Sequence, residues 1–272
     1  MTDHYALFGH PVAHSKSPAV HHAFAAQTGD DLRYELIDAP PGGFAQAVAA
    51  FRAGGGRGAN VTMPFKLEAL ALATRPSARA TLAGAANCLK FDGDAILADN
   101  MDGVGLLHDI QVNQATPLAG RRVLLMGAGG AARGAILPLI EAGPAALTIV
   151  NRTLSKAQAL RDACADRFPV RAVGYGDLGD QAHDLVLNAT SASMNGELPP
   201  APDAVFAPGA LAYDVVYGHG PSPFLAQARR AGAGRLADGL GMLIEQAAES
   251  YLWWRGTRPG TAPLFTLLRP AT

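Results

Sequence analysis

A glycine-rich segment in the middle of the chain carries the clearest chemical signal. An apolar run typical of a buried strand, Val123–Met126, comes before GAGGAA at 127–132, and an apolar helix is predicted to follow. The pattern G-x-G-x-x-A between a strand and a helix predicts a site for a dinucleotide pyrophosphate. Gly127 permits the tight turn, Gly129 lets the backbone approach the phosphates, and Ala132 allows close helix–sheet packing.

The backbone N–H groups of this turn and of the helix N-terminus would face the phosphates. The cofactor-binding candidates in the turn are Gly127, Ala128, Gly129, Gly130 and Ala131.

The residues after the next predicted strand, 147–150, bear on which dinucleotide is bound. An NAD site offers Asp or Glu to the ribose hydroxyls at about 20 residues after the turn. This chain has Asn151, Arg152 and Thr153 there instead. A guanidinium suits the 2′-phosphate of NADP, and Thr153 can offer a hydroxyl while capping the following helix. The sequence predicts NADP(H), the alternative being that Arg152 is an ordinary surface arginine.

Polar side chains also follow two predicted strands near the start of the chain. Ser15 and Ser17, in a loop after the first strand, can offer two hydroxyls to one anionic group. Alternatively, Ser17 simply caps a helix that begins at Pro18, and the two roles are compatible. Thr62 and Lys66 lie at the end of the third strand, and the strand ends of open α/β sheets are where ligands bind.

Further candidates are weaker when taken singly. Asn87 lies in GAANC, and Asp102 precedes Gly103, a position where an aspartate commonly forms a turn. Met242 and Gln246 lie four residues apart on a predicted last helix and share one of its faces, although a methionine there is usually core.

The elements that position these residues alternate between strand and helix. Strands are predicted at 5–9, 33–38, 59–62 and 95–99, with a helix over 44–51 that Gly54, Gly55 and Gly56 end. The stretch 116–120 is predicted as a linker into a second unit of strand–helix pairs that begins at 122–126. A helix over 240–254, then a loop at 257–263, ends the chain. Such alternation indicates an α/β protein with mostly parallel sheets covered by helices on both faces.

Composition excludes several classes of protein. The net charge of −1 disfavours a nucleic-acid binder, and no apolar stretch is long enough to span a membrane. Cys88 and Cys164 have no metal-type spacing, so we expect no metal site there, and we expect both thiols to be reduced in a cytoplasmic location. No basic run followed by an apolar segment occurs near Met1, so we expect no signal peptide. Trp253 and Trp254 are expected to pack the last helix.

Taken in order, eight segments resemble the shikimate dehydrogenase family over nearly the whole chain. They are GHPVAHSKSP at 9–18, NVTMPFK at 60–66, GAANC at 84–88, NMDG at 100–103, GAGGAARG at 127–134, NRT at 151–153, NATSAS at 188–193 and DGLGMLIEQAAE at 238–249. The resemblance implies a substrate domain at 1–103 and 238–272, an inserted Rossmann domain at 104–237, and an active site in the cleft between them. It also implies NADPH-dependent reduction of 3-dehydroshikimate to shikimate.

The resemblance implies a role for each candidate. Lys66 and Asp102 would form the catalytic pair beside the oxygen at C3. Ser15, Ser17 and Tyr217 would hold the substrate carboxylate, and Thr62, Asn87 and Gln246 the ring hydroxyls. Gly239 and Met242 would contact the nicotinamide, and Asn151, Arg152 and Thr153 the adenosine phosphate. The partners would be the small-molecule substrate alone, with no nucleic acid and no membrane, in a monomer or homodimer.

Three residues depart from the family pattern. Cys88 and Met101 stand where threonine is usual, and His22 where asparagine is common. We expect altered kinetics and retained activity. One alternative is a related enzyme, either a quinate/shikimate dehydrogenase that uses NAD or a relative that acts on another cyclic polyol acid. The other alternative is a sensor that binds the cofactor and does not catalyse a reaction. Arg152 disfavours NAD, and retention of Lys66 and Asp102 disfavours the sensor.

Overall fold

The computed structural model describes residues 2–218 and 220–268, and the chain divides into two compact units. The first comprises Met1–Gly105 with Ile244–Thr272, and the second Leu106–Leu243. The sequence predicts a substrate domain at 1–103 and 238–272 and a cofactor domain at 104–237. That assignment of ligands to domains stays a prediction. None of the helices within the described residues is long and apolar enough to cross a membrane.

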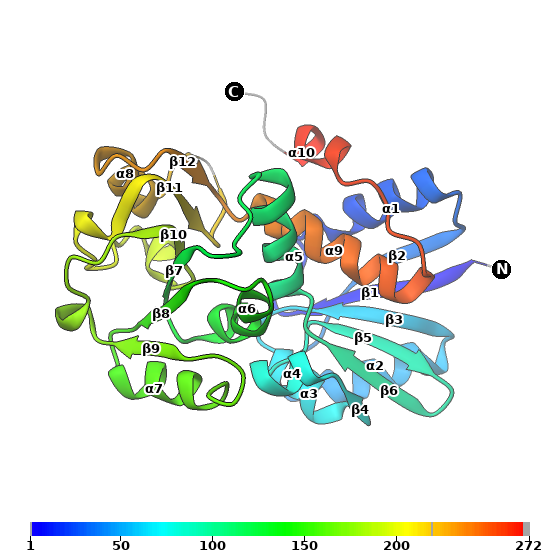
Figure 1. The fold of residues 1–272 in the computed structure, drawn as a ribbon. Coiled ribbons are helices and arrows are strands. Elements are labelled where there is room, and N and C mark those ends of the chain that lie inside the picture. Colours follow the sequence, from blue (N-terminus) through cyan, green and yellow to red (C-terminus); the bar gives the residue numbers. More distant parts are fainter. Residues whose placement is uncertain (1, 219, 269–272) are drawn as a thin grey trace. The chain divides into compact units, whose positions relative to one another are not determined.

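The first unit contains a six-stranded sheet in the order β2-β1-β3-β5-β6-β4 (Figure 1). Its strands are β1 (Asp3–Gly9), β2 (Leu32–Asp38), β3 (Gly56–Val61), β4 (Arg75–Pro76), β5 (Cys88–Asp92) and β6 (Ala95–Asp99). Its helices are α1 (Ser17–Thr28), α2 (Phe44–Ala53), α3 (Lys66–Leu72), α4 (Ala78–Ala83) and α10 (Ala262–Leu268), together with parts of α5 (Asp102–His108) and α9 (Leu240–Arg255).

Alternation along β1 supplies two separate cores. Ala6 and Phe8 pack into a cluster with residues of α2, α3 and α4, whereas Tyr5 and Leu7 belong to a second cluster that includes Trp254 of α9. Successive side chains of a strand point to opposite faces, so each face of this sheet is buried. The residues of α2, α3 and α4 share one face of the sheet, and Figure 1 shows α1 and α9 above it. The predicted α/β class, with helices on both faces, is confirmed.

The pairing in this sheet differs from the predicted parallel arrangement at one strand. β5 is antiparallel to both β3 and β6. The two residues Gly93 and Asp94 connect β5 to β6, and Gly93 has φ 55°. A left-handed glycine in a two-residue connection is typical of a hairpin, and this hairpin places β5 inside the sheet.

The second unit contains an entirely parallel sheet in the order β12-β11-β10-β7-β8-β9. Its strands are β7 (Arg122–Met126), β8 (Ala146–Val150), β9 (Val170–Val173), β10 (His183–Asn188), β11 (Phe206–Asp214) and β12 (Arg235–Ala237). Its helices include α6 (Gly130–Glu141), α7 (Leu154–Asp162), α8 (Pro223–Arg230), a π-helix η1 (Asp109–Asn113) and short 3-10 segments η2 (Tyr175–Asp177), η3 (Ala192–Asn195) and η4 (Asp203–Val205). The strand order reverses between β7 and β10, which makes this the switch point where such sheets bind ligands.

Two local predictions are wrong. The stretch 116–120, predicted as a linker, lies inside the second unit, and Leu118 is fully buried there. The predicted loop 257–263 ends early because α10 begins at Ala262. Leu264 and Leu268 are buried and anchor that short helix. Trp254 packs as expected, since its ring stacks on Tyr5 and its indole N–H donates to the carbonyl of Leu89.

Candidate functional site

The sheet topology of the first unit gathers its polar candidates at one edge. β1 and β3 are parallel, so the loop after Gly9 and the segment after Val61 leave the same edge. The antiparallel β5 begins at this edge, and β6 ends there, because Cys88 pairs with Asp99. Thr62, Lys66, Asn87 and Asp102 follow or precede these strand ends. Four segments that are distant in sequence therefore converge by register alone.

Lys66 and Asp102 form an ion pair at this edge. The Lys66 Nζ lies 2.6 Å from Oδ2 of Asp102, and both side chains are partly buried, with 31% and 14% of their surface exposed. Lys66 begins α3 and Asp102 begins α5. An ammonium held against a carboxylate and still open to solvent can move a proton to or from a bound oxygen atom.

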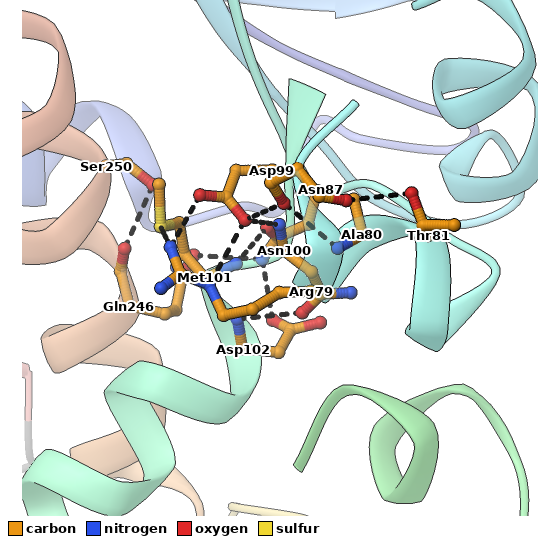
Figure 2. Close-up of polar contacts among 11 residues, drawn as sticks. Arg79, Ala80, Thr81, Asn87, Asp99, Asn100, Met101, Asp102, Gln246 and Ser250 are labelled. Atoms are coloured by element: carbon orange, nitrogen blue, oxygen red, sulfur yellow. Dashed lines mark hydrogen bonds and ion pairs between the residues drawn. The ribbon is translucent and has the colours of Figure 1, made fainter. Parts of the chain in front are cut away.

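Asn87 holds the other oxygen of the same carboxylate. Its Nδ2 donates to Asp102 Oδ1 at 2.8 Å, and its Oδ1 accepts a hydrogen bond from the backbone N–H of Met101 at 2.7 Å. Because a backbone N–H can only donate, it fixes which end of the Asn87 amide is oxygen. The amide N–H group must therefore point at Asp102, as Figure 2 shows.

Gln246 of α9 completes this cluster. Asn87 Nδ2 also lies 3.4 Å from Gln246 Oε1. The approach of α5 to α9 depends on a glycine, since a methyl group added at Gly105 would lie 2.7 Å from both Cα and Cβ of Gln246. The structure thus brings Lys66, Asp102, Asn87 and Gln246 together.

Ser15 and Ser17 face each other in the loop before α1. The Ser15 Oγ donates to Ser17 Oγ at 3.1 Å and accepts from the Ser17 backbone N–H at 3.2 Å. Ser17 is the first residue of α1, and Lys16 occupies the N-cap position without a side-chain cap. The alternative that Ser17 caps this helix is wrong. Two adjacent hydroxyls in a half-buried loop remain available to one anionic group.

The loop that carries these serines lies against the segment that contains Thr62. The backbone N–H of His10 donates to the carbonyl of Met63, and a methyl group at Gly9 would lie 2.5 Å from Cγ2 of Thr62. The close approach at Gly9 places Thr62 beside the serine loop.

Sequence reasoning missed a second layer of polar residues behind the pair. Asp99, at the end of β6, accepts hydrogen bonds from Ser77, Arg79 and the backbone N–H of Asn100. Asn60 of β3 is also buried and donates to the Oγ of Ser250 on α9. The signal in the sequence that could have indicated this layer is an aspartate, Asp99, at the end of a predicted strand. Its partner Arg79 could not be recognised, because it lies 20 residues away in the chain.

None of the three residues expected to depart from the family pattern, Cys88, Met101 and His22, contributes a side chain to the printed contacts of the Lys66–Asp102 pair. Cys88 and Met101 are buried in the cluster that includes Trp254, and burial raises the pKa of the Cys88 thiol. Met101 still donates its backbone N–H to Asn87. His22 is exposed, and its Nε2 accepts the backbone N–H of Tyr34 at 3.3 Å.

In the second unit, the glycine turn has the geometry that a phosphate site needs. Gly127 has φ 107°, and a methyl group there would lie 3.0 Å from the carbonyl oxygen of Ala189. Gly129 and Gly130 are exposed, and no atom of another segment lies within 4 Å of the position a methyl group would take. Ala132 is fully buried against the sheet. The N-terminus of α6 is thus open to an anion.

The residues after β8 present a cation beside this turn. Arg152 is exposed and has no ion-pair partner within the part of the chain that the structure describes. Asn151 Nδ2 donates to the carbonyl of Thr153 at 2.8 Å. Thr153 occupies the N-cap position of α7, as predicted, but its hydroxyl makes no capping bond. The prediction that the Thr153 side chain caps this helix is therefore wrong, and the Thr153 hydroxyl remains available to a ligand.

Tyr217, Gly239 and Met242 also belong to the second unit. Tyr217 is 44% exposed. Gly239 lies against Val215, whose carbonyl oxygen would overlap any side chain at this position. The backbone N–H of Met242 donates to the hydroxyl of Tyr213 at 3.2 Å, and that hydroxyl donates to Asp109 at 2.6 Å. Burial raises the pKa of Tyr213, which keeps the phenol protonated.

Asp214, which ends β11, fixes the loop before Tyr217. This fully buried carboxylate accepts the hydroxyls of Ser193 and Ser222 at 2.5 and 2.6 Å, and the backbone N–H of Val216 at 3.1 Å. No group of three or more His, Cys, Asp or Glu side chains that could hold a metal ion occurs among residues 2–218 and 220–268.

Comparison with known proteins gives concordant matches for both units. A family model described as the shikimate dehydrogenase substrate binding domain matches residues 7–89, and one described as shikimate / quinate 5-dehydrogenase matches residues 110–195. The chain is 57% identical over 269 residues to the shikimate dehydrogenase (NADP(+)) of Nitrosospira multiformis, covering 99% of this chain and 98% of that protein.

Two solved structures are similar over nearly the whole chain. One is an Ael1 enzyme from Pseudomonas putida, with a TM-score of 0.95, 50% identity and 99% of each chain covered. The other is shikimate 5-dehydrogenase from Thermus thermophilus in complex with NADP(H) and shikimate, with a TM-score of 0.84, 31% identity and 96% of each chain covered.

Proposed function

The chain belongs to the shikimate dehydrogenase family, and we propose that it catalyses the NADPH-dependent, reversible reduction of 3-dehydroshikimate to shikimate. The observation that carries this proposal is the Lys66–Asp102 pair, in which each oxygen of the carboxylate has its own donor. A bound carbonyl oxygen beside Lys66 would meet an ammonium that is already oriented.

The chemistry of the reaction explains the residue types. Reduction of the C3 ketone adds a hydride to carbon, and negative charge develops on oxygen until it takes a proton. NADPH supplies the hydride when it is bound. Lys66 stabilises the developing charge and donates the proton, and in the reverse direction it accepts the proton of the C3 hydroxyl. Asp102 orients the ammonium, and Asn87 in turn holds Asp102.

The residues of the second unit fit a dinucleotide phosphate. Open space around Gly129 and Gly130 lets phosphates reach the N–H groups of α6, with Ala128 and Ala131 in the same turn. Arg152 would bind the 2′-phosphate through paired N–H groups, assisted by Asn151 and the unused hydroxyl of Thr153. Gly239 and Met242 would contact the nicotinamide.

Substrate specificity would come mainly from side chains of the first unit, with Tyr217 of the second unit as the exception. Ser15 and Ser17 would bind the carboxylate, with Tyr217 as a further donor, and Thr62, Asn87 and Gln246 would bind the ring hydroxyls. A site that hydrogen-bonds a hydroxyl strongly disfavours analogues that lack it, because its own polar groups are then left unpaired. We further propose a cytoplasmic enzyme, which the two free, buried cysteines fit, acting as a monomer or homodimer.

Steady-state oxidation of shikimate and of quinate, each with NADP and with NAD, tests the proposed function. We expect turnover of shikimate with NADP far above the other three pairings. Equal turnover of quinate, or equal use of NAD, would leave the Lys66–Asp102 chemistry standing and remove the specificity assigned to the ring contacts or to Arg152. Cofactor binding without turnover in any pairing would favour a sensor instead.

A further inference from the structure

We propose that Arg79 is a positioning residue for the catalytic pair and acts through Asp99 and Asn100. The inference rests on the proposed function for the role of the pair, and on the hydrogen bonds of the first unit for everything else. Arg79 lies in α4, and Figure 2 shows the chain of contacts that leads from it to Asp102.

The ion pair between Arg79 and Asp99 is bidentate, and its carboxylate is largely buried. Arg79 Nη2 lies 2.5 Å from Asp99 Oδ2, and Arg79 Nε lies 3.2 Å from Oδ1. Only 8% of the Asp99 side chain is exposed. A planar guanidinium that binds both oxygens fixes the rotation of the carboxylate, which a single-point ammonium cannot do.

The fixed carboxylate then orients the next residue along the chain. Asp99 Oδ1 accepts the hydroxyl of Ser77 at 2.5 Å and the backbone N–H of Asn100 at 2.7 Å. The Asn100 side chain donates to the carbonyl of Ala85 at 3.1 Å and accepts the backbone N–H of Asp102 at 3.2 Å. The backbone of the proposed catalytic carboxylate is thus held two hydrogen bonds away from the Arg79–Asp99 pair.

A second route runs through Asn87. The backbone N–H of Asn87 donates to the carbonyl of Asp99 at 3.1 Å, and the N–H of Met101 fixes the Asn87 amide. Asp102 is oriented by the side chains of Asn100 and Asn87, and both of these residues are held by the turn 99–102. Loss of Arg79 leaves a buried carboxylate without its counter-ion, and the turn must move or admit water to compensate.

The polar contacts of Arg79 among the described residues are with Asp99 and with the sulfur of Met101, at 4.0 Å. Arg79 acts on the chemistry through other residues, which makes it a positioning residue.

The test compares three variants with the wild type. Arg79→Gln removes the ion pair, and Arg79→Gln/Asp99→Asn removes both charges while leaving an oxygen to accept the bonds from Ser77 and Asn100. The matched control is Arg122→Gln, because Arg122 makes a similar two-pronged pair with Asp184 in the second unit, at 3.2 and 3.0 Å.

For Arg79→Gln we expect kcat for shikimate oxidation to fall about tenfold or more, since small displacements of catalytic groups have effects of this size. The Kd for NADP should stay within about twofold of the wild-type value, because the cofactor binds to the other unit. The double variant should recover most of kcat, and Arg122→Gln should keep kcat even if its Tm falls equally. Unchanged kcat in Arg79→Gln, or no recovery in the double variant, would overturn the proposal.

Hydrogen exchange without ligands separates this proposal from the proposed function. In Arg79→Gln, a peptide spanning residues 99–105 should exchange its amide protons faster than in the wild type and in Arg122→Gln. If the wild type turns over none of the substrates, the proposed function fails, and faster exchange would still support the role of Arg79. Unchanged exchange would contradict that role in an active enzyme as well.

Discussion

Replacing Gly105 by alanine tests the close approach of two helices that carry proposed site residues. Glycine within a helix costs about 0.5–1 kcal/mol relative to alanine, so Gly105→Ala should stabilise an isolated α5. In the folded protein the added methyl group would lie 2.7 Å from Cα and Cβ of Gln246, with the Gln246 backbone nitrogen nearer still. The backbone of α9 is the obstacle, and it cannot rotate away as a side chain can.

The size of the effect follows from the overlap. Carbon atoms pack at about 3.5–4.0 Å, so α5 and α9 must separate by about 1 Å. Such overpacking costs about 1–3 kcal/mol of unfolding free energy. At about 2–4 °C per kcal/mol for chains of this size, Tm should fall by roughly 2–12 °C. The Asn87–Gln246 contact of 3.4 Å would also lengthen. A shift of about 1 Å beside the reacting groups can reduce kcat/KM by as much as 10²-fold.

Thermal unfolding and steady-state shikimate oxidation measure both effects. The control is Gly54→Ala in the same unit, where the methyl group would meet its nearest neighbours at 3.5 Å, an ordinary contact, and φ is −77°. The control should keep the wild-type Tm and kcat/KM. A Gly105→Ala protein as stable and as active as the wild type would refute the argument that this glycine sets the position of Gln246.

Two further variants test the cofactor assignment and the buried histidine. Arg152→Asp should raise the Kd for NADP roughly 10- to 100-fold, equivalent to the loss of about 1.5–3 kcal/mol from bonds to a charged group, and fluorescence titration measures it. Full retention of NADP affinity would sink the assignment. Burial lowers the pKa of His21 to about 3, whereas the same imidazole in the unfolded chain is protonated near pH 6.5. Protonation therefore favours the unfolded state, so the free energy of unfolding is highest above pH 6.5 and decreases as pH falls toward 3. His21→Phe should keep the stacking on Tyr34 and remove a decrease in the free energy of unfolding of up to about 1.4 kcal/mol per pH unit. Urea unfolding at several pH values measures this free energy, and an equal decrease between about pH 6.5 and 4.5 in variant and wild type would contradict the assignment.

The features that sequence could predict are those encoded locally. The turn at Gly127 was recognisable because strand, glycines and helix are contiguous, and the structure places β7 and α6 around it. The strand over 95–99 was predicted with the same bounds as β6. Lys66 and Asp102 stood out individually only as polar residues after predicted strands.

The features that sequence could not predict depend on partners far apart in the chain. Arg79 and Asp99 are 20 residues apart, and nothing near either residue identifies the other. The direction of the Asn87 amide depends on a backbone N–H from Met101, 14 residues away. The requirement for glycine at Gly105 comes from a helix more than a hundred residues downstream. Even the hairpin at Gly93, a short-range feature, was missed because β5 had not been predicted as a strand.

The central claim, that the Lys66–Asp102 pair moves the proton, is tested most directly by the turnover of Lys66→Met. Its side chain keeps much of the volume of lysine and has no proton to give. We predict that kcat for shikimate oxidation falls by about 10²–10⁴-fold, the range typical of a lost general acid–base, while the Kd for NADP is unchanged. A Lys66→Met protein that retains kcat within about fivefold of the wild type would contradict the claim, because removal of a proton-transferring group costs at least about 10².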